Sequence, residues 1–175
     1  MKWFQLLILC CFVIPVIAMD CKDLQNRNIE KIVVSEASLI KENGDLPSFC
    51  KIKGVINPNI GFEARLPDKN WNGKFFQAGC GGFCGLIEPD RSSHSNAINH
   101  ALRKGYAAIT TNGGHQGKHL GDADWAKNNA AARKVYAFTV IKFTYDAGHQ
   151  LIKRFYKKKP SYSYFSGCSN GGRLA

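Results

Sequence analysis

The segment GCSNG at residues 167–171 has the spacing of a nucleophilic serine site. It matches the pattern G-x-S-x-G, in which a strand ends, the backbone turns sharply and a helix begins. Ser169 then holds its hydroxyl clear of the backbone, and Gly167 and Gly171 let strand and helix pass closely. The backbone N–H of Asn170, at the start of the helix, can point at a developing oxyanion. We therefore predict that Ser169 is a nucleophile, although a glycine-rich turn after a strand would show the same five residues.

A second glycine-rich segment, QAGCGGFCG at residues 77–85, is our candidate for the other half of an oxyanion hole. It follows an apolar segment, and the backbone N–H groups of Gly81 and Gly82 carry no side chain that could cover them. A phosphate-binding loop is an alternative interpretation, but no Lys-Ser or Lys-Thr pair follows these glycines. A structural tight turn is another.

The segments before Ser169 alternate between strand and helix patterns, and this alternation must position the two glycine-rich segments. From residue 74 onward the order strand, helix, strand, long helix, strand predicts an α/β fold with a parallel sheet covered by helices. Residues 49–67 contain an Asn-Pro-Asn turn, which predicts a hairpin. The expected strands are 29–40, 49–67, 74–79, 106–114 and 162–166, the expected helices are 95–105 and 130–160, and 117–129 is a polar loop.

The first 18 residues have the composition of a signal peptide. Lys2 precedes an apolar run, and Val16 and Ala18 occupy the −3 and −1 positions of a cleavage site. A membrane anchor is the alternative, but about 15 apolar residues are short for a bilayer span. We expect a secreted or periplasmic protein without membrane association after cleavage, with one domain at residues 19–175.

The composition is that of a basic globular protein, with 45% hydrophobic residues, 21% charged residues and a net charge of +11. Most lysines are scattered along the chain, apart from the run KRFYKKKP at residues 153–160. Cations at the end of a helix complement its dipole, so we interpret this run as a solvated helix end rather than a binding patch. We expect no nucleic-acid partner.

Seven cysteines are present, and two of them, Cys10 and Cys11, leave with the signal peptide. Cysteines in an exported protein are expected to form disulfides, and an odd number leaves one thiol without a partner in the chain. The remaining five are Cys21, Cys50, Cys80, Cys84 and Cys168. Cys80 and Cys84 have a spacing that a metal site could use, but no paired histidines accompany them, and we predict no metal.

Three segments together resemble the tannase and feruloyl esterase family. They are FCKIKGVINPNIGFEARLPDKNWNGKFFQAGCGGFCG, GDADWA and SYSYFSGCSNGGR, and the resemblance extends from about Cys21 to the last residue. The resemblance implies a secreted α/β-hydrolase that cleaves esters of phenolic acids. It also implies that residues 19–175 form the N-terminal portion of the catalytic domain, ending just after the nucleophile, with the acid, the base and a lid beyond residue 175.

The resemblance assigns roles residue by residue. Ser169 would be the nucleophile, and the oxyanion hole would be formed by the N–H of Asn170 with that of Gly81 or Gly82. Cys168 would form a disulfide with a cysteine beside the catalytic histidine, beyond this chain. No cofactor is implied here, although calcium in the lid is a family possibility, and the substrate would be a small aromatic ester.

The resemblance also bears on the other cysteines. With Cys168 set aside, three pairings of the other four are open, of which we favour Cys21–Cys50 with Cys80–Cys84. The sequence departs from the family at two positions. Asn112 stands where an aspartate is expected, and Cys80 interrupts the glycine-rich loop.

The histidines of the chain are not expected to supply the catalytic base. In an α/β-hydrolase the histidine follows the serine, whereas all five histidines here precede Ser169. They are His94, His100, His115, His119 and His149. His115 follows a buried strand and is best placed to face a site, but we expect it to make a structural hydrogen bond. Asp122 and Asp124 are expected to fix a loop or cap a helix.

Two hypotheses follow from the sequence. In the first, the chain belongs to a serine esterase that acts through an acyl-enzyme on Ser169, and these 175 residues alone are inactive because the base is missing. In the second, the chain is a non-catalytic exported remnant or binding protein of the same family. The reading frame after codon 175 discriminates between them, because the first requires a later aspartate and a histidine next to a cysteine.

Overall fold

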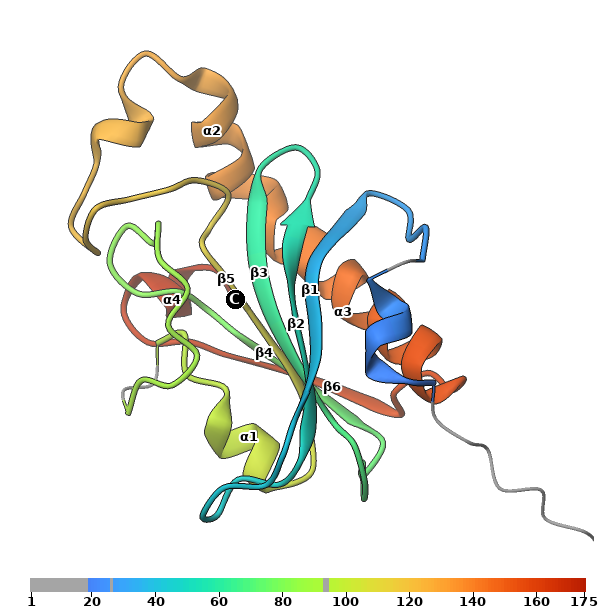
Figure 1. The fold of residues 1–175 in the computed structure, drawn as a ribbon. Coiled ribbons are helices and arrows are strands. Elements are labelled where there is room, and N and C mark those ends of the chain that lie inside the picture. Colours follow the sequence, from blue (N-terminus) through green and yellow to red (C-terminus); the bar gives the residue numbers. More distant parts are fainter. Residues whose placement is uncertain (1–18, 26, 93–94) are drawn as a thin grey trace, which may run out of the picture.

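A six-stranded mixed sheet forms the centre of the fold (Figure 1). The computed structural model describes residues 19–25, 27–92 and 95–175, and the predicted signal peptide lies outside the described residues. The strands are β1 (Ile32–Ile40), β2 (Phe49–Ile56), β3 (Ile60–Pro67), β4 (Lys74–Ala78), β5 (Ala107–Thr111) and β6 (Tyr162–Ser166). They lie side by side in the order β1-β2-β3-β5-β4-β6.

The first half of the sheet is antiparallel. β2 and β3 form the expected hairpin, with Ile56 paired to Ile60 across the turn, and β1 pairs with the outer side of β2. β3 then pairs with β5 in antiparallel orientation. Every residue of β3 is buried, which agrees with a central strand that packs on both faces.

The second half of the sheet is parallel, as the strand and helix alternation predicts. β4 lies between β5 and β6, with Phe76 paired to Ala108 and Ala78 paired to Ser166. Parallel strands need a crossover connection, and helices supply it in both intervals. Because β4 and β6 are neighbours and parallel, the segments that follow them, at residues 79 and 167, emerge at the same edge of the sheet.

The helices are shorter and more interrupted than expected. The helix expected at 95–105 is α1 (Asn99–Arg103), because Asn96 has a φ of 62° that a helix does not allow. The helix expected at 130–160 consists of α2 (Ala130–Lys134), a π-helical turn η3 (Val135–Thr139) and α3 (Val140–Tyr156). α3 ends at Lys157, whose backbone is left-handed with a φ of 57°. Two 3-10 turns, η1 (Cys21–Leu24) and η2 (Asp124–Ala126), and the short α4 (Asn170–Arg173) complete the fold.

Adjacent residues of β4 show how the two faces of the sheet are covered. Side chains alternate along a strand, so Phe75 and Phe76 point to opposite faces. Phe75 packs against α3, where a Cβ on Gly148 would lie 2.4 Å from the ring, so glycine lets this helix approach the sheet. Phe76 faces α1, with its ring centroid 4.9 Å from that of His100.

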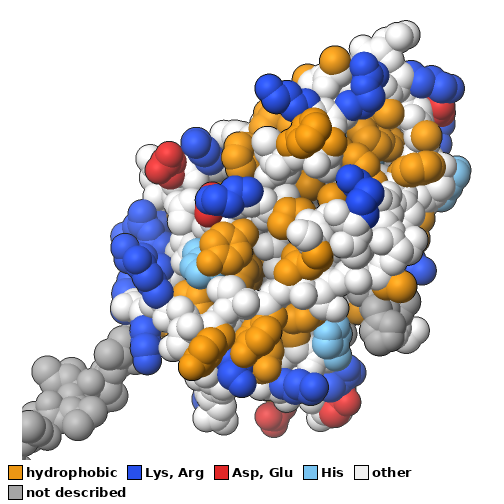
Figure 2. All heavy atoms as spheres, turned by 180° about the vertical axis from the view of Figure 1, so that it is seen from behind, with side chains coloured by type: hydrophobic (Ala, Val, Ile, Leu, Met, Phe, Trp, Pro, Cys, Tyr) orange, Lys and Arg blue, Asp and Glu red, His pale blue; other side chains and the backbone are white. Residues whose placement is uncertain are grey.

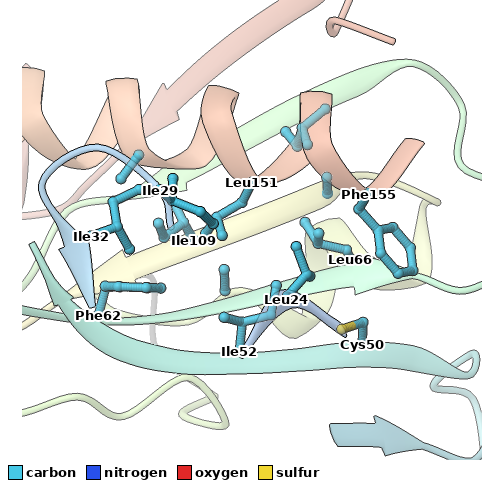
Figure 3. Packing of buried hydrophobic residues seen from close by; sticks show 14 of the residues in the cluster. Leu24, Ile29, Ile32, Cys50, Ile52, Phe62, Leu66, Ile109, Leu151 and Phe155 are labelled. Atoms are coloured by element: carbon cyan, nitrogen blue, oxygen red, sulfur yellow. The ribbon is translucent and has the colours of Figure 1, made fainter. Parts of the chain in front are cut away.

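The main hydrophobic core lies between α3, η1 and the first half of the sheet (Figure 3). Leu151 and Phe155 of α3 pack over Ile52, Phe62 and other strand residues, and all of these side chains are at most 1% exposed. Burying an aliphatic or aromatic side chain of this size stabilises a fold by roughly 1.5–3 kcal/mol. Within the described residues, no helix combines the length and apolar character needed to cross a bilayer.

Candidate active site

The turn after β6 has the strand–turn–helix form that the sequence predicts for Ser169. β6 ends at Ser166 and α4 begins at Asn170. Ser169 lies between them with φ 55° and ψ −125°, a backbone conformation that residues other than glycine rarely adopt. Strain of this kind costs about 1–3 kcal/mol and is concentrated at functional sites. Ser169 is exposed, so its hydroxyl is accessible at the apex of the turn.

Glycines allow the chain segments around Ser169 to pass one another. A Cβ on Gly167 would lie 2.3 Å from the carbonyl oxygen of Gly171, and a Cβ on Gly79 would lie 2.6 Å from the same oxygen. Strand, loop and helix therefore meet at distances that no side chain would permit. The backbone N–H of Gly79 also donates to the carbonyl of Ser166 at 2.8 Å, which attaches the loop after β4 to the end of β6.

Three carbonyl groups of the glycine-rich loop at residues 79–85 accept hydrogen bonds from nearby residues. The carbonyl of Gly79 accepts from the N–H of Asn96 at 3.0 Å, and that of Gly81 accepts from the N–H of Cys84 at 2.9 Å. The carbonyl of Phe83 accepts from Nε2 of His115 at 2.7 Å. Because a peptide's N–H points away from its carbonyl, each of these bonds also orients an N–H group.

Three backbone N–H groups in α4 and the glycine-rich loop have no partner among the described residues. Within the part of the chain that the structure describes, the N–H groups of Gly81, Gly82 and Asn170 donate to no other residue. The side chain of Asn170 contacts the carbonyl oxygen of Gly82, so α4 and the loop lie against each other. Free N–H donors beside an exposed serine are what an oxyanion hole requires. The fold thus brings the sequence-predicted residues together.

Two disulfides join the cysteines in the favoured pairing. Cys21 is bonded to Cys50, which fastens η1 to β2, and Cys80 is bonded to Cys84 within the glycine-rich loop. Cys168 is free and exposed, next to Ser169. Among the described residues, no cluster of three or more His, Cys, Asp or Glu side chains is arranged to hold a metal ion.

His115 is a structural residue, as expected. The carbonyl of Phe83 can only accept, so Nε2 of His115 carries the proton in this hydrogen bond. The ring stacks on Trp125 with centroids 3.7 Å apart, and burial lowers the pKa of His115, which keeps the imidazole neutral. Nδ1, the nitrogen that could accept a proton, is buried and makes no hydrogen bond to Ser169 or to any other described residue.

The other histidines and the two acidic residues also have structural partners. His149 lies 2.9 Å from the hydroxyl of Ser163 at the far end of β6, and His94 lies outside the described residues. No hydrogen bond joins a described histidine to Ser169. Asp122 accepts from the backbone N–H groups of Lys118 and Asp124, which fixes the loop and lowers the pKa of its carboxyl group.

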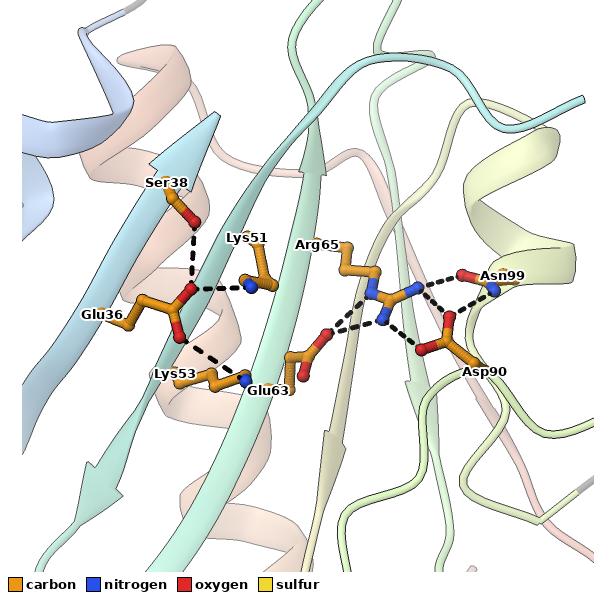
Figure 4. A network of polar contacts seen from close by, with 8 residues as sticks. All are labelled: Glu36, Ser38, Lys51, Lys53, Glu63, Arg65, Asp90 and Asn99. Carbon is orange, nitrogen blue, oxygen red and sulfur yellow. Dashed lines mark hydrogen bonds and ion pairs between the residues drawn. The ribbon is translucent and has the colours of Figure 1, made fainter. Parts of the chain in front are cut away.

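An ion network centred on the buried residues Arg65 and Glu63, which the sequence does not reveal, joins β3 to Asp90 and α1 (Figure 4). Arg65 of β3 lies 2.8 Å from Glu63 and 2.7 Å from Asp90, and it also contacts the side-chain oxygen of Asn99. The Arg65 guanidinium holds the pKa of Asp90 below its usual value. The network thereby anchors the segment that contains Asn96, whose N–H holds the carbonyl of Gly79.

Sequence analysis also missed the residues that surround Asn170. The side-chain amide of Asn170 contacts the hydroxyl of Tyr136, and Arg173 lies over the Tyr136 ring at 4.9 Å. Tyr136 also meets Trp125 and His115, with ring centroids 5.0 and 5.6 Å away. The apolar spacing of residues 130–160 predicted one regular helix. It therefore gave no sign of the π-helical turn that contains Tyr136.

Comparison with known proteins agrees with this geometry. Residues 45–175 match the family described as tannase and feruloyl esterase. An uncharacterised esterase of Xanthomonas campestris pv. campestris is 37% identical over 134 residues, which cover 74% of this chain and 22% of that protein. Feruloyl esterase B of Aspergillus niger is 35% identical over 111 residues, which cover 63% of this chain and 19% of that protein.

A solved structure shows the same fold. The crystal structure of feruloyl esterase B from Aspergillus oryzae superposes with a TM-score of 0.73 at 25% sequence identity. The superposition covers 87% of this chain and 33% of that one. The chain thus spans 19–22% of the two curated relatives above. The match to the family over residues 45–175, the two relatives and the shared fold lead to one conclusion: this chain belongs to the tannase and feruloyl esterase family.

Proposed function

We propose that this chain carries the nucleophile and the oxyanion hole of a serine ester hydrolase. The observation that supports the proposal is the position of Ser169, exposed at a strained turn and close to a loop in which the N–H groups of Gly81 and Gly82 donate to no described residue. Strain at such a turn is maintained only where the surrounding structure determines it, and here the close approach of Gly79 and Gly167 to Gly171 does so.

In the proposed reaction, Oγ of Ser169 attacks the carbonyl carbon of the ester, and its proton passes to a histidine base. The carbonyl oxygen becomes an oxyanion, which accepts hydrogen bonds from the N–H of Asn170 and from that of Gly81 or Gly82. Collapse of this intermediate releases the alcohol, which takes the proton, and leaves an acyl-enzyme on Ser169. Water then hydrolyses the acyl-enzyme by the same steps. Serine acyl transfer of this kind requires no cofactor.

We propose that the substrates are small esters of aromatic or phenolic acids. The support is the similarity to a feruloyl esterase B, together with the family match. The base and its orienting aspartate are proposed to follow Ser169 in a longer protein, as the α/β-hydrolase order requires. The exposed thiol of Cys168 is then proposed to pair with a cysteine beside that histidine.

We also propose that the protein works outside the cytoplasm, secreted or in the periplasm, after removal of residues 1–18. Two disulfides in a chain of this size favour an oxidising compartment. No nucleic-acid partner and no membrane association are proposed for residues 19–175.

For the 175-residue chain by itself, we propose acylation of Ser169 without turnover. A triad that lacks a member keeps the contribution of its oxyanion hole, about 10³–10⁴-fold over water, so an activated ester can still acylate the serine. Deacylation requires the same base and should be slow. The acyl group would therefore accumulate on Ser169, and methyl ferulate should not be hydrolysed above background.

The test is the mass of the chain after incubation with p-nitrophenyl ferulate. A Cys168→Ala background prevents the neighbouring thiol from competing, and peptide mapping locates the acyl group. We expect one feruloyl group on Ser169, lost in Ser169→Ala and retained in the matched control Ser161→Ala, an exposed serine before β6. Labelling that is unchanged in Ser169→Ala would overturn the proposal and favour the non-catalytic alternative.

A further inference from the structure

We propose that the side chain of Asn170 is a positioning group that connects the two halves of the oxyanion hole. This inference rests on the proposed function, in which the backbone N–H of Asn170 supplies one donor and the loop at Gly81 and Gly82 supplies the other. The same residue would then serve the reaction twice, through its backbone as a donor and through its carboxamide as a link to the second donor.

The first observation is the contact between Asn170 and the loop. Nδ2 of Asn170 donates to the carbonyl oxygen of Gly82. The N–H of the same peptide group, which belongs to Phe83, donates to the carbonyl of Leu120 at 2.6 Å. The Gly82–Phe83 peptide is therefore held at both ends, and it fixes one side of Gly82, whose own N–H belongs to the preceding peptide.

The second observation is that the orientation of the carboxamide is fixed by its other partners. Oδ1 of Asn170 accepts from Nε of Arg173 at 2.6 Å, so the other end of the amide must be the donating NH₂ group. That group also donates to the hydroxyl of Tyr136, and the Arg173 guanidinium lies 4.9 Å above the Tyr136 ring. Asn170 is thus held by α4 on one side and by the π-helical turn on the other.

The third observation is that this part of the loop is intrinsically flexible and depends on its contacts for its conformation. Gly81 and Gly82 are consecutive glycines, and Gly82 has a φ of 58°. Glycines have the widest conformational freedom of all residues, so the donors need an external restraint to stay aimed at one point. Inside the loop, the Cys80–Cys84 disulfide and the Cys84 N–H, which donates to the carbonyl of Gly81 at 2.9 Å, restrain the chain. Asn170 adds a contact from α4, at the carbonyl of Gly82.

This role makes a prediction about rate that a purely structural role does not. A donor that is present but loosely held should stabilise the oxyanion less, while binding of the ester before reaction is unaffected. Removing a donor entirely costs about 10²–10³-fold in rate, so loss of the restraint alone should cost less, about tenfold. A structural role in α4 would instead lower the melting temperature and leave the acylation rate of the folded chain unchanged.

The experiment measures acylation of Ser169 by p-nitrophenyl ferulate in the Cys168→Ala background, as a function of ester concentration. Asn170→Ala should lower the maximal rate about tenfold at an unchanged half-saturating concentration. Asn170→Asp has the same shape but cannot donate to Gly82, and its charge faces the developing oxyanion. It should therefore lower the rate further, about a hundredfold. Asn43→Ala, an exposed asparagine between β1 and β2, is the matched control.

Two further measurements keep the result interpretable. Tyr136→Phe removes one oxygen and leaves the Asn170–Gly82 contact, so by the same reasoning it should reduce the rate only about two- to threefold. Hydrogen exchange at the Phe83 amide should be faster in Asn170→Ala than in the Asn43→Ala control. If the parent chain does not label at Ser169, the proposed function fails. If it labels and both Asn170 variants label at the parent rate, this inference fails and the proposed function stands.

Discussion

The two edge strands of the sheet differ in composition, support and exposure. β1 has nine residues and carries Glu36, which pairs with Lys51 and Lys53 of the neighbouring β2 (Figure 4). β6 has five residues, YSYFS, without a charge, and four of them are exposed. The outer edge of β1 is therefore charged, while the outer edge of β6 is uncharged and leads directly into Ser169.

This difference places stability and chemistry in different parts of the molecule. The main core, η1 and the Cys21–Cys50 disulfide support the half of the sheet that contains β1, β2 and β3. The site half has a smaller cluster on the α1 face and a strand whose hydrogen bonds reach only β4 on one side. Fixed polar contacts around the loop, rather than burial, hold the candidate site in position.

The largest effect on the free energy of unfolding should come from breaking the ion network around Arg65, which connects β3 to the segment before α1. Arg65→Met leaves Glu63 buried without its partner, and breaking a buried pair in this way costs about 3–5 kcal/mol of the free energy of unfolding. The matched change Lys51→Met removes a partly exposed ion pair at the β1 edge and should cost about 0–1 kcal/mol. Urea unfolding of both variants measures the difference, and equal losses would contradict it.

The two disulfides should differ in what they stabilise. Cys21 and Cys50 are 29 residues apart and Cys80 and Cys84 only four, so chain entropy predicts about 3.5 and about 2 kcal/mol respectively. We expect Cys21→Ala/Cys50→Ala to lose more stability, and Cys80→Ala/Cys84→Ala to lose more of the acylation rate at Ser169. Urea unfolding and mass spectrometry of the acylated chain test both statements. The reverse order in either measurement would show that the division between the two regions is wrong.

The uncharged edge should make the isolated chain self-associate. Phe138 is 79% exposed and Tyr162 is 63% exposed. Hydrophobic side chains also gather between scattered lysines on the face that Figure 2 shows. Unpaired edges and apolar patches promote association. Tyr162→Lys should shift the chain toward the monomer in sedimentation velocity. The control Val33→Lys changes a 59% exposed residue of the β1 edge and should shift it less.

The smallest expected effect is on the pH dependence of stability, through His115, which contacts the glycine-rich loop at Phe83. Burial lowers the pKa of His115 below its value in the unfolded chain, about 6.5. Below that pH the unfolded chain binds a proton that the folded chain resists, so the stability present above about pH 6.5 is lost as the pH falls. The pKa of His149 is lowered as well, so the contribution of His115 is measured as the difference between the parent chain and a His115 variant. His115→Gln should flatten the slope of unfolding free energy between about pH 5 and pH 7, and an unchanged slope would show that His115 does not contribute.

Sequence analysis predicted the local features of the fold well. The hairpin, the parallel second half of the sheet and the turn around Ser169 all follow from patterns within a few residues. Helix lengths were the weakest part, because Asn96 interrupts the first helix and a π-helical turn interrupts the second.

By itself, the sequence determined the order of strands and helices, the candidate nucleophile Ser169 and the family resemblance, because these depend on residue types at short spacing. Only the tertiary structure showed that Arg65 supports the loop and that the side chain of Asn170 contacts Gly82. Those contacts join residues that are 25 and 88 positions apart. Such contacts exist only after the strands have paired, because pairing of β4 with β6 brings both segments to one edge of the sheet.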